Sequence, residues 1–298
     1  MRSYRSRPLL VTMSAVVALS GCATGTPLAT AGSSPSAPAT ADAAFSSLEH
    51  RYGARLGVYA LDTGSGRTVA YRADERFAYA STLKALSAGI LLRRDSDTEL
   101  NRVITYRRAD LQEYSPVTGK HVATGMTLRD IIVAALQYSD NTAANLMTDQ
   151  LGGPAGLQHA LRGLGDRTTH VDRTEPHLND AVPGDVRDTS TPRALGTDLR
   201  SFVLGDLLPA AHRQLLKSWM LGNTTGGPYI RDGAPTGWKV GDKTGNGGYG
   251  TRNDIAIAWP PTGSPVVIAL QSDRNNARAN SADGLLADAT RAALAELR

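Results

Sequence analysis

The chain has 298 residues, of which 41% are hydrophobic, so it is long enough and apolar enough to fold around a packed core. Its formal charge of +4 includes Arg2, Arg5 and Arg7 at the start of the chain, and without these three arginines 29 basic residues face 28 acidic ones. Only 5% of the residues are aromatic and Lys/Arg runs are absent, which excludes the basic footprint of a nucleic-acid-binding protein.

The basic start leads into an apolar run, Leu9 to Leu19, that is too short to span a bilayer. Residues 1–21 are therefore predicted to be an export signal. The signal closes with Leu19-Ser20-Gly21-Cys22, which resembles a bacterial lipobox, so we expect an exported cell-envelope lipoprotein anchored through Cys22, or a form released from that anchor. Cys22 is the only cysteine, so no disulfide can form within the chain, and the alternative is an incidental thiol.

Residues 22–41 consist almost entirely of Ala, Ser, Thr, Gly and Pro. Such a composition buries too little apolar surface to offset the entropy of ordering, so a flexible tether is expected. The folded part should begin at about residue 42 and continue to residue 298.

Short segments rich in Val and Ile near both ends of this part predict strands, and each group is accompanied by a helical segment. Turn residues such as Asp62-Thr63-Gly64-Ser65-Gly66 separate the strands. The helices are predicted at 41–52 and 282–297, and the strands at 55–61, 67–71, 238–244, 254–259 and 265–271. We expect the first and last segments to share one sheet covered by helices.

The middle of the chain has helical periodicity, for example behind Thr127, a good N-cap, and Pro154 and Pro192 stand where a first helical turn tolerates proline. The chain is therefore predicted to form two lobes: residues 42–76 and 222–298 make an α/β lobe, and residues 77–221 make an all-helical lobe. A cleft between the helical lobe and one edge of the sheet is where a site is expected.

Ser81 and Lys84 form a Ser-x-x-Lys pair at the predicted start of a helix. Residues three apart share a helix face, so the lysine can reach the serine hydroxyl, and the positive end of the helix dipole favours an oxyanion formed on attack. This geometry makes a serine nucleophilic, although the pair alone is a weak signal.

Two further tripeptides are individually ordinary. Ser139-Asp140-Asn141 falls at a junction between two predicted helices, where capping is the usual role, and Lys243-Thr244-Gly245 ends a predicted strand. The hydroxyl of Ser139 could relay a proton, Lys243 supplies a positive charge, and Gly245 has no side chain to obstruct a ligand.

In this order, and with Glu175-Pro176 and Asn179 between the second and third motifs, the set resembles a class A β-lactamase. The resemblance covers residues 42–298. It implies a two-lobed α/β fold, with a five-stranded antiparallel sheet flanked by helices plus an all-helical lobe. It also implies hydrolysis of the β-lactam ring of antibiotics, and hence resistance, by a monomer without metal or organic cofactor.

The resemblance further implies the role of each catalytic residue. Ser81 would form the acyl-enzyme, Glu175 would activate the deacylating water, and Asn179 would help to position that water. Either Lys84 or the water bound by Glu175 would take the serine proton in acylation, and these alternatives stay open. Ser139 completes the catalytic set.

Substrate-binding residues follow from the same resemblance. The backbone N–H groups of Ser81 and Asn246 would hold the carbonyl oxygen. Asn141 would contact the acyl side-chain amide, and Tyr114 would lie at the pocket rim, with a surface tyrosine as the alternative. The substrate carboxylate would be held by Lys243, Thr244 and Arg252, with Arg231 as a weaker candidate.

Residues 170–190 show neither helical nor strand periodicity, so we expect a long irregular loop that must be held together internally. The resemblance maps a clamp within this loop onto Arg173 and Asp188, and makes a cis bond before Pro176 expected. The preferred β-lactam class stays open, although the single cysteine excludes the disulfide found beside the site in some carbapenem-hydrolysing relatives.

Three other functions share some of these sequence features. A D-alanyl-D-alanine peptidase shares three of the motifs but has no reason to keep Glu175 and Asn179 in these positions. A metallo-hydrolase needs clustered ligands, and the six histidines show no His-Glu-x-x-His spacing. A non-catalytic lipoprotein that senses cell-wall peptides or β-lactams has no need of an intact Ser81, Lys84 and Glu175.

Overall fold

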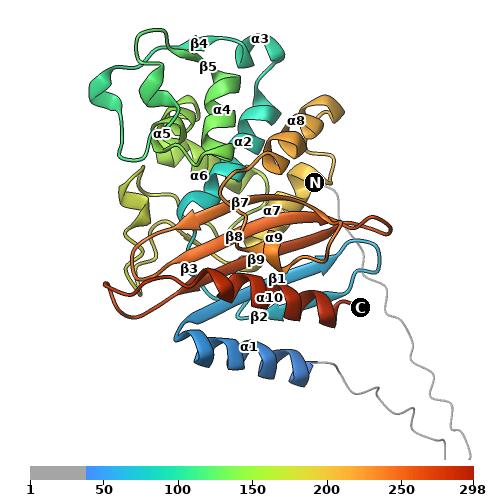
Figure 1. Ribbon diagram of the computed structural model, residues 1–298. Coiled ribbons are helices and arrows are strands. Elements are labelled where there is room, and N and C mark those ends of the chain that lie inside the picture. The colour runs from blue at the N-terminus through green and yellow to red at the C-terminus, as the bar shows by residue number, and fades with distance from the viewer. Residues whose placement is uncertain (1–37) are drawn as a thin grey trace, which may run out of the picture. The chain divides into compact units, whose positions relative to one another are not determined.

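The computed structural model of the protein describes residues 38–298 (Figure 1). The predicted export signal, Cys22 and most of the predicted tether lie outside the described residues. Helix α1 (Pro38–Tyr52) begins three residues before the predicted start at Ala41, because alanine favours a helix and proline is tolerated in its first turn. Between residues 38 and 298, no helix has both the length and the apolarity needed to cross a membrane.

Five antiparallel strands form the main sheet, in the order β2-β1-β9-β8-β7. The predicted five-stranded sheet is therefore confirmed, and the predicted strand ends differ from the observed ones by one or two residues. The bounds are β1 (Arg55–Asp62), β2 (Thr68–Tyr71), β7 (Lys239–Asn246), β8 (Arg252–Trp259) and β9 (Val266–Asp273).

Helices cover both faces of this sheet (Figure 1). On one face, α1 and α10 (Asp283–Glu296) pack beside the short α9 (Ile230–Gly233), and the alternate strand residues Ala256 and Ile268 point into that layer. On the other face, Ile255 and Val267 join a core with α7 (Pro192–Val203) and α8 (Ala210–Leu221). The central strands are buried on both faces for this reason.

The remaining helices lie beyond α7 and α8, with α2 nearest to them. Their bounds are α2 (Leu83–Arg94), α3 (Asp97–Leu100), α4 (Leu128–Gln137), α5 (Asn141–Gln150) and α6 (Gly153–Gly163). Thr127 caps α4 by accepting a hydrogen bond from the Asp130 N–H, as predicted. Two strand pairs complete the fold: β3 (Phe77–Ala78) with β6 (Thr189–Ser190), and β4 (Val103–Ile104) with β5 (Met126–Thr127).

Helix α2 is buried on every side from Leu83 to Leu92. The helix has no solvent face because α4 and α5 pack on one side of it and α7 and α8 on the other. Gly89 makes this close packing possible, since a Cβ there would lie 2.6 Å from the ring of Phe202 in α7. The element that follows Ser81 is therefore fixed in the middle of the core.

Candidate active site

Ser81 lies on a 3-10 turn, Ala80–Thr82, directly before α2. The prediction placed this serine at the start of a helix. Ala80 has φ 47, and the Thr82 hydroxyl donates to the carbonyl of Tyr79 at 2.7 Å, which holds the turn tightly. Ser81 therefore stands at the positive end of the helix, as expected, but on a more constrained backbone.

Lys84 is buried and binds three oxygen atoms at short range. Its Nζ lies 2.8 Å from Ser139 O, 2.8 Å from Asn141 Oδ1 and 2.9 Å from Glu175 Oε1. Burial lowers the pKa of Lys84, and the neighbouring Glu175 carboxylate opposes that shift. Three acceptors around one nitrogen are the environment of an ammonium group.

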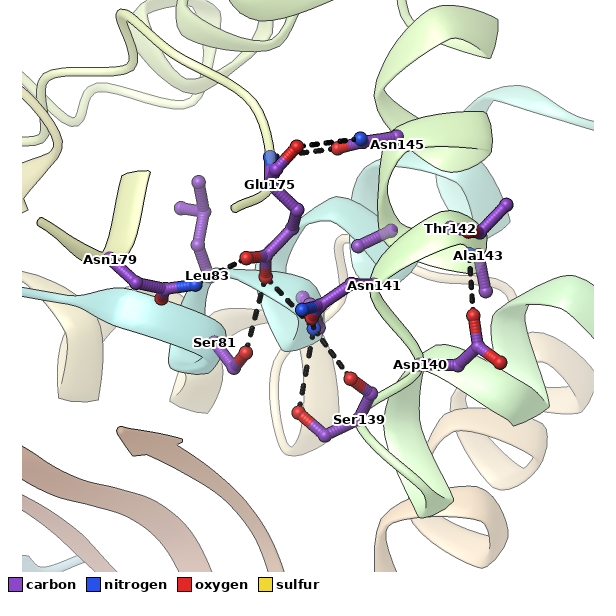
Figure 2. A network of polar contacts seen from close by, with 12 residues as sticks. Ser81, Leu83, Ser139, Asp140, Asn141, Thr142, Ala143, Asn145, Glu175 and Asn179 are labelled. Carbon is purple, nitrogen blue, oxygen red and sulfur yellow. Dashed lines mark hydrogen bonds and ion pairs between the residues drawn. The ribbon is translucent and has the colours of Figure 1, made fainter. Parts of the chain in front are cut away.

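Glu175 is 2% exposed and points from its loop toward Ser81 (Figure 2). Its Oε1 accepts a hydrogen bond from Ser81 Oγ at 3.3 Å as well as binding Lys84, and its Oε2 accepts one from Asn179 Nδ2. The backbone of Glu175 is held by Asn145, which accepts from its N–H and donates to its carbonyl, both at 2.9 Å. The carboxylate is thus fixed at both its backbone and its oxygens.

The loop that carries Glu175 is closed by the ion pair that the resemblance implied. Arg173 Nε lies 2.5 Å from Asp188 Oδ2, and a second guanidinium nitrogen lies 2.6 Å from Asp180 Oδ2. The peptide bond between Glu175 and Pro176 is cis, also as expected. These contacts tie the two ends of the irregular segment to its middle.

The Ser139-Asp140-Asn141 segment joins α4 to α5, and the side chain of Asp140 holds it in place through hydrogen bonds. The fully buried carboxylate of Asp140 accepts hydrogen bonds from the backbone N–H groups of Val117, Thr118 and Ala143. Ser139 adopts φ 56, which directs its side chain toward the two lysines. Its Oγ lies 3.4 Å from Lys84 Nζ and 3.1 Å from Lys243 Nζ.

Lys243 lies on β7 with its side chain fully buried. Burial and then the charge of Lys84 lower the pKa of Lys243 to about 7. The preceding residue, Asp242, lies on the opposite face of the strand and pairs with Arg231 at 2.6 Å. Arg231, the weaker candidate for binding a carboxylate, is therefore occupied by a buried acid and does not line the cleft.

A cavity of about 430 Å³ opens over these groups. Eight of the predicted site residues line it: Ser81, Tyr114, Ser139, Asn141, Asn179, Thr244, Asn246 and Arg252. Lys84, Glu175 and Lys243 are buried against them and bind them directly. The structure therefore brings the separate motifs together around one cleft.

Tyr114 forms part of the rim and is 60% exposed. Its backbone adopts φ 62, and its carbonyl accepts a hydrogen bond from the N–H of Asn141 at 3.0 Å. The predicted placement of this side chain at the pocket rim agrees with that position.

Arg252, the first residue of β8, lies opposite Asn246 and beside the cavity. Its guanidinium donates to Ser281 at 2.6 Å, pairs with Asp283 at 3.2 Å and lies over the ring of Tyr229. One face and one edge of the guanidinium are thus fixed, which gives it a defined direction.

The missing side chain of Gly245 has a different structural role from the predicted one. A Cβ at Gly245 would lie 2.8 Å from the carbonyl of Tyr79, so the missing side chain lets β7 pack against the turn that carries Ser81. It does not make room for a ligand, because the space beside it is already filled by the protein.

Three residues near the site were not identified from the sequence. Asn145 holds the backbone of Glu175, while Thr225 and Tyr229 line the cavity, and Thr225 shares a 2.6 Å hydrogen bond with Thr244. The spacing of Asn145 from Asn141, one helical turn on, could have suggested it. Nothing in the local sequence indicated Thr225 or Tyr229.

Among residues 38–298 no three His, Cys, Asp or Glu side chains gather in a way that could hold a metal ion.

Residues 40–297 match the model of a family described as the beta-lactamase enzyme family. A β-lactamase from Amycolatopsis lactamdurans is 57% identical over 253 residues, which cover 85% of this chain and 84% of the relative. A β-lactamase from Bacillus licheniformis is 52% identical over 281 residues, or 94% of this chain and 92% of the relative.

Solved structures agree with these relatives. A class A β-lactamase from Clostridium kluyveri aligns with a TM-score of 0.86 at 47% identity, covering 87% of this chain and 98% of that one. A β-lactamase from Streptomyces albus G aligns with a TM-score of 0.84 at 47% identity, covering 87% and 99%.

Proposed function

The chain belongs to the class A β-lactamase family, and from that premise we propose which of its residues carry the reaction. It hydrolyses the β-lactam ring of antibiotics by a serine mechanism, as a β-lactamase that confers resistance. The observation that carries the assignment of roles is the contact of one carboxylate oxygen of Glu175 with both Ser81 and Lys84.

In acylation, Ser81 Oγ attacks the lactam carbonyl carbon while its proton passes to Glu175, directly or through a water molecule. Two observations support this choice over Lys84. The Ser81 hydroxyl donates to Glu175, and Lys84 Nζ already donates to Ser139, Asn141 and Glu175, which leaves it no lone pair directed at the serine. Lys84 then acts as a cation that stabilises the developing negative charge.

Opening of the ring requires a proton for the departing lactam nitrogen, and we assign that step to Ser139. Its Oγ lies near the ammonium groups of both Lys84 and Lys243, which donate toward it. The hydroxyl hydrogen of Ser139 is therefore free to be donated into the cleft. Lys84 can then return a proton to Ser139 and recover one from Glu175, its ion-pair partner, so that Glu175 is again a carboxylate before deacylation.

Deacylation is assigned to Glu175 with Asn179. Once Ser81 Oγ is esterified it has no hydrogen to donate, so the Glu175 carboxylate can accept a hydrogen bond from a water molecule. Asn179 Oδ1 is buried and has no hydrogen-bond partner within residues 38–298, which makes it a second acceptor for that water. Glu175 takes one proton from the water and the hydroxide attacks the ester carbon; the proton then passes from Glu175 to Ser81 Oγ as the ester bond breaks.

The carboxylate and carbonyl of the substrate are assigned to the edge of the sheet. Lys243, Thr244 and Arg252 would hold the carboxylate, because an arginine fixed by Asp283 and Tyr229 presents its remaining N–H groups in one direction. The N–H groups of Ser81 and Asn246 would hold the carbonyl oxygen.

The test is steady-state hydrolysis of a panel of penicillins, cephalosporins and carbapenems by the wild type and by Glu175→Ala, with mass spectrometry of the enzyme. We expect Glu175→Ala to accumulate an acyl adduct of one equivalent and to turn over on the order of a thousandfold more slowly. Glu113→Ala, which removes an exposed acid near the rim, is the matched control. Full turnover by Glu175→Ala would refute the assigned role.

We further propose that residues 1–21 direct export, that Cys22 carries a lipid anchor, and that the mature enzyme is a monomer with the two lobes predicted above. The support is the apolar segment ahead of Leu19-Ser20-Gly21-Cys22. Cys22→Ala should move activity from the membrane fraction to the medium, and light scattering of the soluble form should give about the mass of one chain. An unchanged membrane fraction would refute the anchor.

A further inference from the structure

Two buried carboxylates face each other where the loop that carries Glu175 joins the helical core. Asp166 follows α6 and stands just before this loop, and Asp198 lies in α7, which begins just after it. Both residues are 8% exposed, and the carboxylate of Asp166 lies close enough to Asp198 to raise its pKa. Neither residue was identified from the sequence as more than an ordinary acid.

The orientation of Asp166 is set by the backbone. Its Oδ1 accepts hydrogen bonds from the N–H groups of Thr168 at 2.6 Å and Thr169 at 3.0 Å. Its Oδ2 and the Oδ2 of Asp198 are both buried, and neither has a donor anywhere in the described part of the chain. Each carboxyl group thus has one buried oxygen without a donor, and for two neighbouring acids this is unfavourable unless one of them is protonated.

We propose that Asp166 and Asp198 share one proton, so that a neutral carboxyl of Asp198 donates to Asp166 and ties α7 to the start of the Glu175 loop. Asp198 is then a positioning residue, because it acts on the reaction only through that loop. The inference rests on the proposed role of Glu175 for its catalytic consequence, but not for the shared proton itself.

The charges around the pair favour this arrangement. Burial and then the carboxylate of Asp166 raise the pKa of Asp198 to about 8, and of the charged groups within residues 38–298 only Asp166 acts on it. Arg162 of α6 donates to the carbonyls of Asp166 and Thr169, and Arg76 to the carbonyl of Thr168. These arginines bind backbone oxygens at the same turn, so neither neutralises the acid pair.

The pair lies at the base of the loop. Directly beyond Asp166, the hydroxyls of Thr169 and Ser190 are 2.7 Å apart, and the N–H of His170 donates to the carbonyl of Thr189 at 2.9 Å. These contacts hold the two ends of the loop side by side. The hydrogen bond made by the shared proton adds a link between α7 and the segment just before the loop. Losing that hydrogen bond should therefore loosen the loop that carries Glu175.

Asp198→Asn separates a shared proton from a merely structural contact, because an amide donates to Asp166 at every pH. The raised pKa of folded Asp198 means that its stabilising contribution is complete at low pH and is lost as the pH rises toward about 8. The thermal midpoint of the wild type should therefore fall between about pH 5 and about pH 9 by more than that of Asp198→Asn.

The deacylation rate is the second readout. Wild type and Asp198→Asn should deacylate alike near pH 6, and the wild type should become slower by on the order of tenfold relative to the variant above about pH 9. Asp206→Asn, which removes an exposed acid just after α7, should follow the wild type throughout. A ratio of variant to wild type that does not change with pH would refute the proposal.

A second variant and a direct titration test the proposal even if Asp198→Asn does not fold. In Asp166→Asn, the side-chain oxygen can still accept from Thr168 and Thr169 while the amide donates to Asp198, so this variant should also lose the pH dependence. Carbon-13 NMR of the wild-type carboxyl groups should show Asp198 titrating near pH 8. Titration near its ordinary value of about 4 overturns the proposal, whereas normal turnover by Glu175→Ala overturns only the role of the loop.

Discussion

Replacing Arg173 with alanine should loosen the loop that presents Glu175. The guanidinium lies 2.5 Å from Asp188, which is fully buried, and 2.6 Å from Asp180, which is half-exposed. Truncation leaves the buried carboxylate of Asp188 without its cation. The loop then has to accommodate an uncompensated charge next to the segment that carries the catalytic carboxylate.

The cost can be worked from the contacts that remain. Removing one partner of a buried ion pair destabilises a protein by about 3–5 kcal/mol. Asp188 keeps three donors, the N–H groups of Asp172 and Arg173 at 2.9 Å and the Tyr79 hydroxyl at 3.1 Å, so the loss should be nearer to about 2–3 kcal/mol. A matched control is Arg187→Ala, because Arg187 pairs with Asp185 in the same loop but is largely exposed, so this change should leave the stability nearly unaltered.

Urea unfolding measures the stability of both variants, and stopped-flow hydrolysis of nitrocefin measures their kinetics. Arg173→Ala should slow deacylation more than acylation, so that a burst of product precedes a slower steady state. The reasoning fails if Arg173→Ala unfolds at the same urea concentration as Arg187→Ala, or if its burst and steady-state rates equal those of the wild type.

Two further outcomes concern groups that contact the site from beneath. Lysine is charged below its pKa, so the attraction of Lys243 for a substrate carboxylate should weaken, and KM should rise, as the pH rises through about 7. Lys243→Arg should flatten this rise in KM, because arginine stays charged. A wild-type KM that does not change with pH would contradict the assignment. Asn145→Ala removes two hydrogen bonds to the backbone of Glu175. It should lower the free energy of unfolding by about 1–3 kcal/mol and slow deacylation. An unchanged urea midpoint would show that Asn145 does not hold the loop.

Much of the sheet could be predicted from the sequence, because β-branched runs and turn residues are local signals. The five strands were placed within one or two residues of their observed ends. Helix α2 shows where local signals fail. Its sequence includes the polar residues Lys84 and Ser87, and only the tertiary packing shows that both are buried.

The site residues also separate into those that local motifs reveal and those that only the packing reveals. Residues inside recognisable motifs were identified: Ser81 lines the cleft and Glu175 contacts Ser81 from beneath it. Asn145 was missed because its contact with Glu175 joins residues thirty apart in the chain. The pair of Asp166 and Asp198 was missed for the same reason, since only packing shows that two acids share one buried space.

The order of the strands has a consequence for how the protein is made. The central strand β9 ends at residue 273 and lies between β1, from the beginning of the folded part, and β8. A chain still emerging from the ribosome therefore lacks the strand that pairs with both β1 and β8. Until β9 is available, the edges of β1 and β8 stay unpaired and can associate with other chains, so the sheet can close only late in synthesis.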